Sequence, residues 1–596
     1  MISSLMGESV DSQSNSSFWT QLFAQDRLLS GSIIILLYII IATLFALAIS
    51  NYIKKIYKGE PTWLDPVAGP VVSFFEKLFH EGPEKEMTFR GYFKTLLLFN
   101  AYAGIVAFVV LYFQNFIPFS HTTYKFSLSL AFNTVSSFLT NTDLQHYSSP
   151  FDLSYFSVTF VIIGLMFLSA ATGFAASMAF IRGIIQDKGT IGNFYHDFLV
   201  STFYLIFPLV IVSTVILLLL GVPSTLNTYV IVHPFLGIGS ESLPLGPVAP
   251  FEAIKNIGTN GGGFYAANAG YPLENPNWFS NLVEFICFTL IPLASLLSLG
   301  KVFGSKGFGN MLYGVVISIF LFTTYLTFFG EYAGIPAITS LGTLYTGNIL
   351  GKEVAIGISQ SSIFSTGAVF TSTGAANSVL LAFTPAGLIG LFGNLLLNDP
   401  LGGVGTGVMN MFTYVIFAMF ITSLMIGKLP ELMGLKIGSR EIRYSTLSLV
   451  THPLLILIPF GITMIFPSLI IGDPNPKIDI ISQILYEFAS AASNNGSEIG
   501  GFMTNTAYFN ILDGVIMILG RYLIMGLQLL IAQSFAFKSP KIQFGRSVDP
   551  ASPLFGLMLF STLILVGVLS FFPLLALGPF LQWARDFNFL TAVILH

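Results

Sequence analysis

The sequence predicts an all-α polytopic membrane protein with about ten transmembrane helices, arranged as four helix/pore-loop/helix repeats with one extra helix at each end. The first observation is composition, because 54% of the 596 residues are hydrophobic and 9% are charged, whereas soluble domains carry roughly 25% charged residues. The second is a set of ten apolar segments near the length that spans a bilayer. The third is a pattern that occurs four times: a spanning helix, a short helix ending at a strip rich in Gly, Asn and Thr, and a second spanning helix.

The amino-terminal region, residues 1–90, is predicted to hold one span and one interfacial segment. The apolar run from Gly31 to Tyr52 follows a polar lead without a basic segment or a small-residue cleavage site, so we expect a retained helix. Three lysines follow this run, which places that end on the cytoplasmic side and the amino terminus outside. The segment Trp63–Phe79 is too short and too rich in proline to span, and we expect it to lie along the interface.

The four pore repeats are predicted at residues 91–196, 197–308, 309–445 and 446–550, and the final span lies within residues 551–596 at about Leu554–Leu577. The short helices that lead into the polar strips are expected at Phe126–Leu139, Pro250–Ile257, Ser359–Ser372 and Ile481–Ala492. The spans that flank them are expected at Phe93–Phe116 and Tyr155–Ile181, Phe198–Leu220 and Trp278–Leu299, Leu312–Phe329 and Leu388–Ile426, and Ser448–Ile471 and Phe509–Phe535.

The second span of the third repeat is long enough to be broken. The break is expected at Asn398–Gly403, because Pro400 cannot donate into the helical hydrogen-bond ladder and two glycines follow it. We therefore predict two helical pieces in place of one long span.

The distribution of basic residues supports one orientation of the chain. If the four strips enter from outside, 18 of the 25 Lys and Arg residues lie in or beside cytoplasmic loops, which is the bias of a correctly oriented membrane protein. The opposite orientation would invert this bias. Both termini are then expected outside.

The four polar strips are predicted to form one cation site. A strip that enters the hydrocarbon cannot face lipid, because unpaired backbone groups there cost several kcal/mol each. We therefore expect the strips to face a common axis. Rings of carbonyl oxygens bind a weakly hydrated ion such as K⁺, and each short helix aims its partly negative carboxyl end at the same place.

The strip Gly258–Phe264 is the most distinctive of the four. It contains three consecutive glycines, which have no side chain to pack, so the backbone is expected to do the binding. Asp143 is the only carboxylate inside the first strip and Glu498 follows the fourth. The site is therefore mostly neutral, which favours K⁺ over divalent ions. The candidate K⁺-filter residues are Thr140, Asn141, Thr142, Thr259, Asn260, Gly261, Gly262, Thr373, Gly374, Ala375, Asn494, Asn495 and Gly496.

These residues resemble a known family. Gly258–Phe264, followed by Asn268 and by Glu274-Asn275-Pro276, is similar to the signature of the potassium-binding subunit of the bacterial Kdp potassium-transporting ATPase. Ser490–Ser497 resembles that family's fourth filter and Asn141–Gln145 its first, and the similarity extends over nearly the whole chain. Two positions depart from the family: Asp143-Leu144 stands where Asn-Trp is usual, and Thr373 stands where a cysteine is common.

The resemblance implies four pore units related to a potassium-channel-like ancestor, K⁺ as the transported ion, and no nucleotide bound by this chain. It implies a P-type ATPase catalytic subunit, a single-span accessory subunit and a small peptide subunit as partners, in the inner membrane of a bacterial cell, with no nucleic acid. It also implies roles in the ion path or its gating for Arg521 and Lys428, which match basic positions of the family. Asp399 is the carboxylate nearest to one that the family has in the broken helix.

Several alternatives stand beside this interpretation. Glycine-rich strips can serve close helix packing, Arg521 can be half of a structural ion pair, and Lys428 can be a positive-inside anchor. The alternative function is a channel-like K⁺ transporter or symporter that works without an ATPase chain.

The sequence argues against catalysis by this chain. No Gly-Lys pair is followed by Ser or Thr, so there is no Walker A motif, and there is no Asp-Lys-Thr-Gly phosphorylation motif. The chain is therefore expected to be a non-catalytic subunit. The seven histidines lack the i, i+4 spacing of a helical zinc site, and a membrane-embedded enzyme would need a clustered nucleophile and base that the sequence does not suggest.

Overall fold

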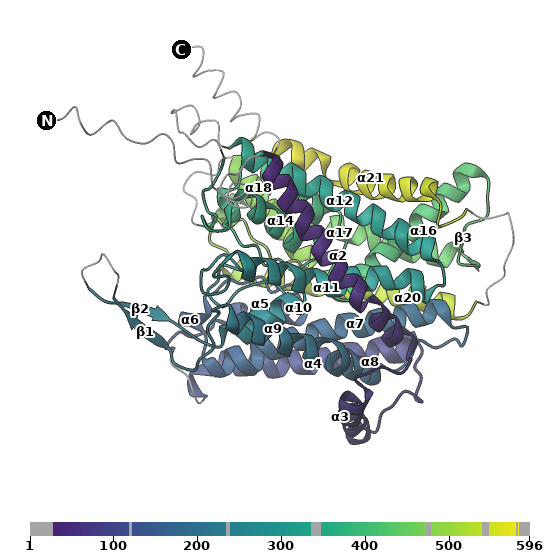
Figure 1. Ribbon diagram of the computed structural model, residues 1–596, viewed down its shortest axis with the longest axis horizontal. Helices are drawn as coiled ribbons and strands as arrows, with labels where there is room; N and C mark the ends of the chain where they lie inside the picture. Colours follow the sequence, from purple (N-terminus) through teal and green to yellow (C-terminus); the bar gives the residue numbers. More distant parts are fainter. Residues whose placement is uncertain are drawn as a thin grey trace, which may run out of the picture.

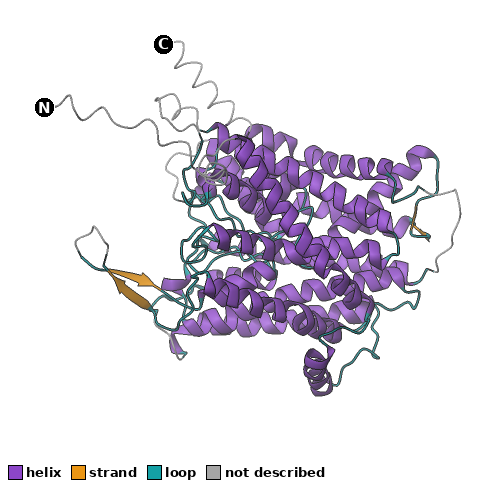
Figure 2. Cartoon of the chain, viewed as in Figure 1, coloured by secondary structure: helices purple, strands orange, loops and turns teal. Residues whose placement is uncertain are grey.

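The computed structural model describes residues 28–117, 122–233, 239–334, 347–471, 478–538, 548–579 and 582. Within these ranges, ten helical segments are long and apolar enough to cross a membrane, and helices account for most of the chain (Figure 2). The predicted all-α polytopic fold is therefore confirmed. The two chain termini, which the sequence predicts to be outside, lie beyond the described residues.

The ten segments run side by side along the long axis of the molecule (Figure 1). Three of them contain a π-helical turn: Ser157–Ile162, Ser201–Ile206 and Leu519–Leu523. The long helices are α2 (Leu28–Lys58), α4 (Phe89–Tyr112), α7 (Ile163–Ile185), α8 (Phe194–Val200) continuing into α9 (Phe207–Leu219), α11 (Trp278–Val302), α12 (Lys306–Ala333), α16 (Thr406–Ile426), α17 (Ser439–Ile465), α19 (Ala507–Ile518) continuing into α20 (Ile524–Ala536), and α21 (Pro553–Leu577).

Four short helices lie between pairs of long ones, as the repeat pattern predicts. All four are in the half of the molecule nearer to the β1–β2 hairpin (Figure 1), so they approach the middle of the bundle from the same side. They are α5 (Leu128–Leu139), α10 (Val248–Ile257), α14 (Gly357–Phe370) and α18 (Ile478–Ser493).

The two long helices of each repeat differ in burial. In the helices before the short helix (α4, α8 with α9, α12 and α17), 28–50% of the most apolar window is buried within the protein. In the helices after it (α7, α11, α16, and α19 with α20), 61–78% is buried. The second helix of each repeat therefore lines the interior of the bundle, and the first one faces outward, where apolar side chains meet lipid.

The third repeat contains the predicted break. Its second span consists of α15 (Pro385–Leu396) and α16, joined by residues 397–405 in a non-helical segment. Asn398 and Asp399 both have left-handed backbone, with φ of +56° and +47°. The short helix α14 ends at Phe370 and not at the expected Ser372, because the chain leaves helical geometry one residue after Thr371.

The remaining elements lie at the edges of the bundle. The helix α3 (Asp65–Phe79) is set apart from the long helices (Figure 1) and leaves Val67, Phe74 and Leu78 exposed, as suits a segment lying at a membrane interface. The antiparallel strands β1 (Tyr229–Val232) and β2 (Glu241–Pro244) project from one end of the bundle, and no sequence pattern predicted them. Smaller elements are α6 (Ser149–Asp152), β3 (Glu431–Leu432), β4 (Leu435–Lys436) and 3₁₀ turns at Gln114–Phe116, Leu380–Ala382 and Pro467–Leu469.

Candidate functional site

Each short helix runs into a strip of four residues held by the same backbone hydrogen bond. Strips 1 to 4 are Thr140–Asp143, Gly258–Gly261, Thr371–Gly374 and Ser493–Gly496. The third residue of every strip donates its N–H to the carbonyl oxygen five residues earlier. Because all four short helices end with this same bond, the strips are structurally equivalent. The four bonds are Thr142 to Ser137 at 3.0 Å, Asn260 to Lys255 at 2.8 Å, Thr373 to Ala368 at 2.8 Å and Asn495 to Ser490 at 2.9 Å.

The second residue of every strip has a left-handed backbone. The values of φ are +63° at Asn141, +49° at Thr259, +55° at Ser372 and +56° at Asn494. This conformation is uncommon outside glycine and strained for a β-branched residue such as Thr259, and such strain is typical of functional sites.

The left-handed conformation returns near the end of each strip. It recurs at the fourth residue of strips 1, 3 and 4, and at Gly262 just after strip 2. Positive φ at two places in or beside each strip keeps this backbone out of helix and strand, and irregular backbone at membrane depth is tolerated where it is buried in protein or lines a cavity.

The four strips meet around the Cα atom of Gly261. A Cβ atom placed on Gly261 would lie 2.7 Å from the carbonyl oxygen of Thr142, 3.0 Å from that of Thr373 and 3.1 Å from that of Asn495. These are the third residues of the other three strips. A Cβ atom on Gly496 would likewise overlap the Thr142 carbonyl oxygen. The sequence thus places glycine where three strips bring carbonyl oxygens together and no side chain fits.

Side chains of the strips donate hydrogen bonds to neighbouring strips. The Asn141 amide donates to the carbonyl oxygen of Thr259 at 2.6 Å, and the Ser372 hydroxyl donates to that of Asn494 at 2.8 Å. The Asn494 amide donates to the Thr142 hydroxyl at 2.9 Å. Each of these bonds joins two strips from different repeats, so the four strips form one connected unit.

Asp143 and Gln145 fasten strip 1 to strip 2. The backbone N–H of Gly261 donates to Asp143 Oδ2 at 3.1 Å, and that of Gly263 donates to Gln145 Oε1 at 2.7 Å. Asp143 is fully buried, and its Oδ1 has no hydrogen-bond partner among the described residues. The single carboxylate of the strips therefore has one oxygen engaged in bracing and one free to interact with a cation.

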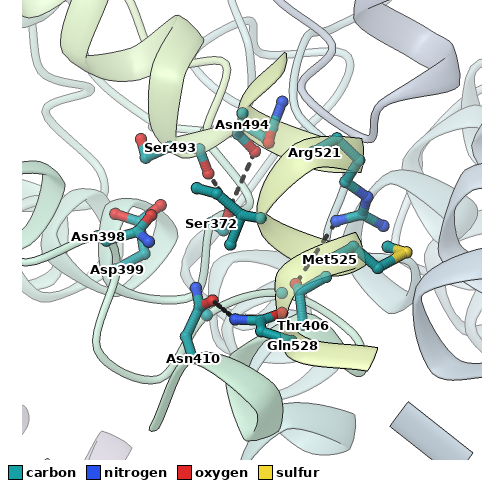
Figure 3. A pocket seen from close by; sticks show the side chains of 14 residues that line it. Ser372, Asn398, Asp399, Thr406, Asn410, Ser493, Asn494, Arg521, Met525 and Gln528 are labelled. Atoms are coloured by element: carbon teal, nitrogen blue, oxygen red, sulfur yellow. Dashed lines mark hydrogen bonds between the residues drawn. The ribbon is translucent and has the colours of Figure 1, made fainter. Parts of the chain in front are cut away.

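A small cavity of about 20 Å³, room for about one water-sized sphere, adjoins strips 3 and 4. Its lining combines strip residues with the break in the third repeat and with the fourth repeat's second helix (Figure 3). The polar side chains that line it are Ser372, Asn398, Asp399, Thr406, Asn410, Ser493, Asn494, Arg521 and Gln528. Ionisable residues such as Asp399 and Arg521 are rare inside a membrane bundle, where they face its interior or a water-filled cavity, and they often mark an ion pathway.

Arg521 contributes the positive charge of this cavity. It lies in the π-helical turn Leu519–Leu523 and is 6% exposed. Its guanidinium donates to the carbonyl oxygen of Ser169 at 3.1 Å and to the Thr406 hydroxyl at 3.5 Å. Both partners are neutral, so these contacts hold the guanidinium in place without neutralising it.

The candidate filter residues from the sequence lie in or directly beside the four strips. Ser372 was missed, because the sequence placed the start of strip 3 at Thr373, two residues late, and Ala375 lies one residue past its end. Counting from the Thr-x-Thr spacing shared by Thr140 and Thr371 would have found the register. Lys428 is exposed beyond the far end of α16, roughly 30 Å along the helix from Thr406 at 1.5 Å per residue, so the structure does not bring it to the strips.

Comparison with known proteins points to one family. Residues 35–583 match the family described as potassium-transporting ATPase A subunit. The chain is 60% identical over 571 residues to the potassium-transporting ATPase potassium-binding subunit of Thermoplasma acidophilum, covering 96% of this chain and 97% of that protein. It is 37% identical over 545 residues to the subunit of the same name from Caldanaerobacter subterraneus, covering 91% of this chain and 97% of that one.

A solved structure shares the fold. The potassium transporter TrkH from Vibrio parahaemolyticus superimposes with a TM-score of 0.50 at 14% sequence identity, covering 87% of this chain and 100% of that chain. At this identity the likeness concerns the arrangement of helices and loops alone.

Proposed function

The chain belongs to the family of potassium-transporting ATPase A subunits, and on this premise we propose that it is the potassium-binding and translocating subunit of an ATP-driven, high-affinity K⁺ uptake complex. The observation that carries the proposal is the meeting of Thr142, Thr373 and Asn495 carbonyl oxygens around Gly261. Carbonyl oxygens in such rings replace the hydration shell of K⁺.

The charge around the strips suits a monovalent cation. Four short helices end at the strips, and each carboxyl end carries roughly half a negative charge from its aligned peptide dipoles. Asp143 adds one carboxylate with an unpartnered oxygen. This modest negative potential favours a dehydrated K⁺ ion, whereas Ca²⁺ and Mg²⁺ sites use several carboxylates or retained waters.

The cavity beside strips 3 and 4 is the proposed continuation of the ion path. A K⁺ ion that leaves the strips meets the carbonyl and hydroxyl oxygens of its lining and then the Arg521 guanidinium. A positive charge at this depth opposes straight passage of a cation across the membrane. Arg521 thereby directs the ion toward a partner chain and limits leakage, with Asp399 on the same cavity wall available as a counter-charge.

Energy for uptake comes from another chain in this proposal. We expect this subunit to bind no nucleotide, and ATP hydrolysis is assigned to a P-type ATPase catalytic subunit. A single-span accessory subunit and a small peptide subunit complete the proposed complex in the cell (inner) membrane. The family match favours this arrangement over a transporter that works alone.

The proposed orientation places the strips' mouth outside and the basic loops in the cytoplasm. The chain offers a clean test, because Cys287 is its only cysteine and is buried. A cysteine introduced by Ser242→Cys in the hairpin strand β2 should react with a membrane-impermeant maleimide in intact cells, and one introduced by Lys428→Cys should react only after permeabilisation. The reverse pattern would contradict the orientation.

Reconstitution tests the proposed function itself. The chain and its ATPase partner, reconstituted together in liposomes, should transport K⁺ only when ATP is supplied on the side of the membrane where the partner binds nucleotide. The chain alone should give no sustained K⁺ flux. Flux of equal rate without the ATPase chain would contradict the proposal and favour the channel-like alternative.

A further inference from the structure

A buried cluster of three metal-binding side chains lies behind the strips, outside the ion path described above. His146 follows strip 1 in the chain, Glu487 comes from the short helix α18, and Asp513 comes from α19. One ligand atom from each lies within 4.8 Å of the other two. We propose that His146, Glu487 and Asp513 bind a divalent first-row transition-metal ion that fastens repeat 1 to repeat 4.

The orientation of His146 leaves the correct nitrogen free. Its Nδ1 lies 2.6 Å from Asn510 Oδ1, and the Asn510 amide nitrogen donates elsewhere, to Asn505 at 3.0 Å. Asn510 Oδ1 is therefore the acceptor, and Nδ1 carries the hydrogen. In the neutral imidazole this leaves a lone pair on Nε2, which lies 3.5 Å from Glu487 Oε1. Metal-binding histidines are typically oriented by such a hydrogen bond on the other nitrogen.

Among the described residues, three of the four carboxylate oxygens of the cluster have no hydrogen-bond partner. Both side chains are buried, and neither oxygen of Asp513 has a hydrogen-bond partner among the described residues. Glu487 Oε1 and His146 Nε2 are unpartnered in the same sense. Burying two carboxylates without compensation is strongly unfavourable. A divalent cation bound by two carboxylates and one neutral imidazole makes the cluster neutral and occupies all of these atoms at once.

The ligand set selects the class of metal. One imidazole and two carboxylates without a thiolate suit Zn²⁺, Mn²⁺ or Fe²⁺. Ligand atoms about 2.1 Å from a tetrahedral ion lie about 3.4 Å apart, whereas these atoms lie within 4.8 Å of one another, so binding would draw them together by up to about 1.4 Å.

The position of the cluster gives the metal a structural role at the filter. Gln145, the residue before His146, donates its backbone N–H to Glu498 of the fourth repeat at 3.2 Å, and its side chain binds Gly263 N–H. A metal ion bound next to this segment would hold the end of strip 1 against repeat 4. The interpretation does not depend on which ion the filter itself selects.

Metal analysis of the purified full-length protein tests the proposal. After removal of any affinity tag and dialysis without strong chelators, mass spectrometry should find about one first-row metal ion per chain. Asp513→Asn and Glu487→Gln should each reduce this content about tenfold, because an amide is a poor replacement for a carboxylate ligand. Glu353→Gln, at an exposed residue outside the cluster, is the matched control and should retain the metal.

A second measurement covers the case in which a variant fails to fold. Wild-type protein treated with EDTA should unfold at a higher temperature after addition of Zn²⁺ or Mn²⁺, and Co²⁺ loading should give visible absorption bands from a bound ion. Wild-type protein that contains no such metal and responds to none of the three ions would overturn the proposal, and the cluster would then be held by shared protons. Neither measurement uses K⁺ transport, so failure here leaves the proposed function standing.

Discussion

Replacement of Gly261 by alanine tests the carbonyl geometry of the strips most sharply. The added methyl carbon would lie 2.7 Å from the Thr142 oxygen and 3.0 Å from the Thr373 oxygen, both closer than ordinary carbon–oxygen contacts of about 3.3 Å or more. These oxygens belong to backbone that is fixed by the shared hydrogen bonds of the strips. The methyl group therefore cannot be accommodated by a side-chain rotation and must displace the carbonyl groups themselves.

Forcing an extra methyl group into a well-packed site typically costs about 1–3 kcal/mol. If that energy falls on the K⁺-bound arrangement, the K⁺ concentration for half-maximal activity should rise about 5-fold to 150-fold, at about 1.4 kcal/mol per tenfold change. The assay is K⁺-stimulated ATP hydrolysis by the assembled complex over a range of K⁺ concentrations. Rb⁺ and Na⁺ titrations on the same preparation show whether discrimination is relaxed as well.

A matched control is Gly164→Ala. Gly164 lies exposed in α7, and a Cβ atom there would meet no atom within 4 Å. Its half-maximal K⁺ concentration should stay within about twofold of the wild type, because a helical Gly→Ala change alters stability by only about 1 kcal/mol. A Gly261→Ala complex that assembles normally and shows unchanged K⁺ dependence would refute the carbonyl-cage interpretation and assign this glycine to packing.

Three further changes address individual charged residues. Asp143→Asn keeps an oxygen that can accept from the Gly261 N–H but removes the negative charge, so the affinity for K⁺ should fall several-fold. If the K⁺ titration of ATPase activity is unchanged, this charge plays no part in binding. Arg521→Met should leave the complex assembled but alter the ratio of K⁺ transported to ATP hydrolysed, and Arg521→Lys should bring this ratio partly back toward the wild-type value. Loss of assembly in both variants would indicate a purely structural residue. Lys428→Gln should change neither K⁺ affinity nor that ratio, because the residue lies exposed beyond the far end of α16; a change in either would place it in the ion path.

The fold followed from features that act over short stretches of sequence. Apolar length set the ten spans, and Pro400 with its glycines set the break between α15 and α16, because a missing backbone donor ends a helix wherever it occurs. The β1–β2 hairpin was not predicted. Tyr229–Val232 consists of four consecutive apolar residues, so it has none of the apolar and polar alternation that marks a half-buried strand, and its four side chains are all exposed.

The site was predicted in part, for a physical reason. Gly258–Phe264 is unusual in composition because its backbone must approach other strips closely, and this is visible in the sequence. The register of strip 3 was misplaced, because the role of Ser372 rests on its left-handed backbone and its bond to the Asn494 carbonyl, and the Thr-x-Thr spacing was the one sequence signal for it. The cluster of His146, Glu487 and Asp513 depends on three elements that meet only after folding, so no spacing along the chain could reveal it.

The central claim is that four strips form a K⁺-selective site that serves an ATPase. The most direct measurement is ATP hydrolysis by the native complex titrated in parallel with K⁺, Rb⁺ and Na⁺. The structure predicts strong stimulation by K⁺ at low concentration and little by Na⁺, because the carbonyl cage replaces the hydration shell of the larger, more weakly hydrated ions K⁺ and Rb⁺ more readily than that of Na⁺. Equal stimulation by Na⁺, or hydrolysis that does not depend on K⁺, would contradict it.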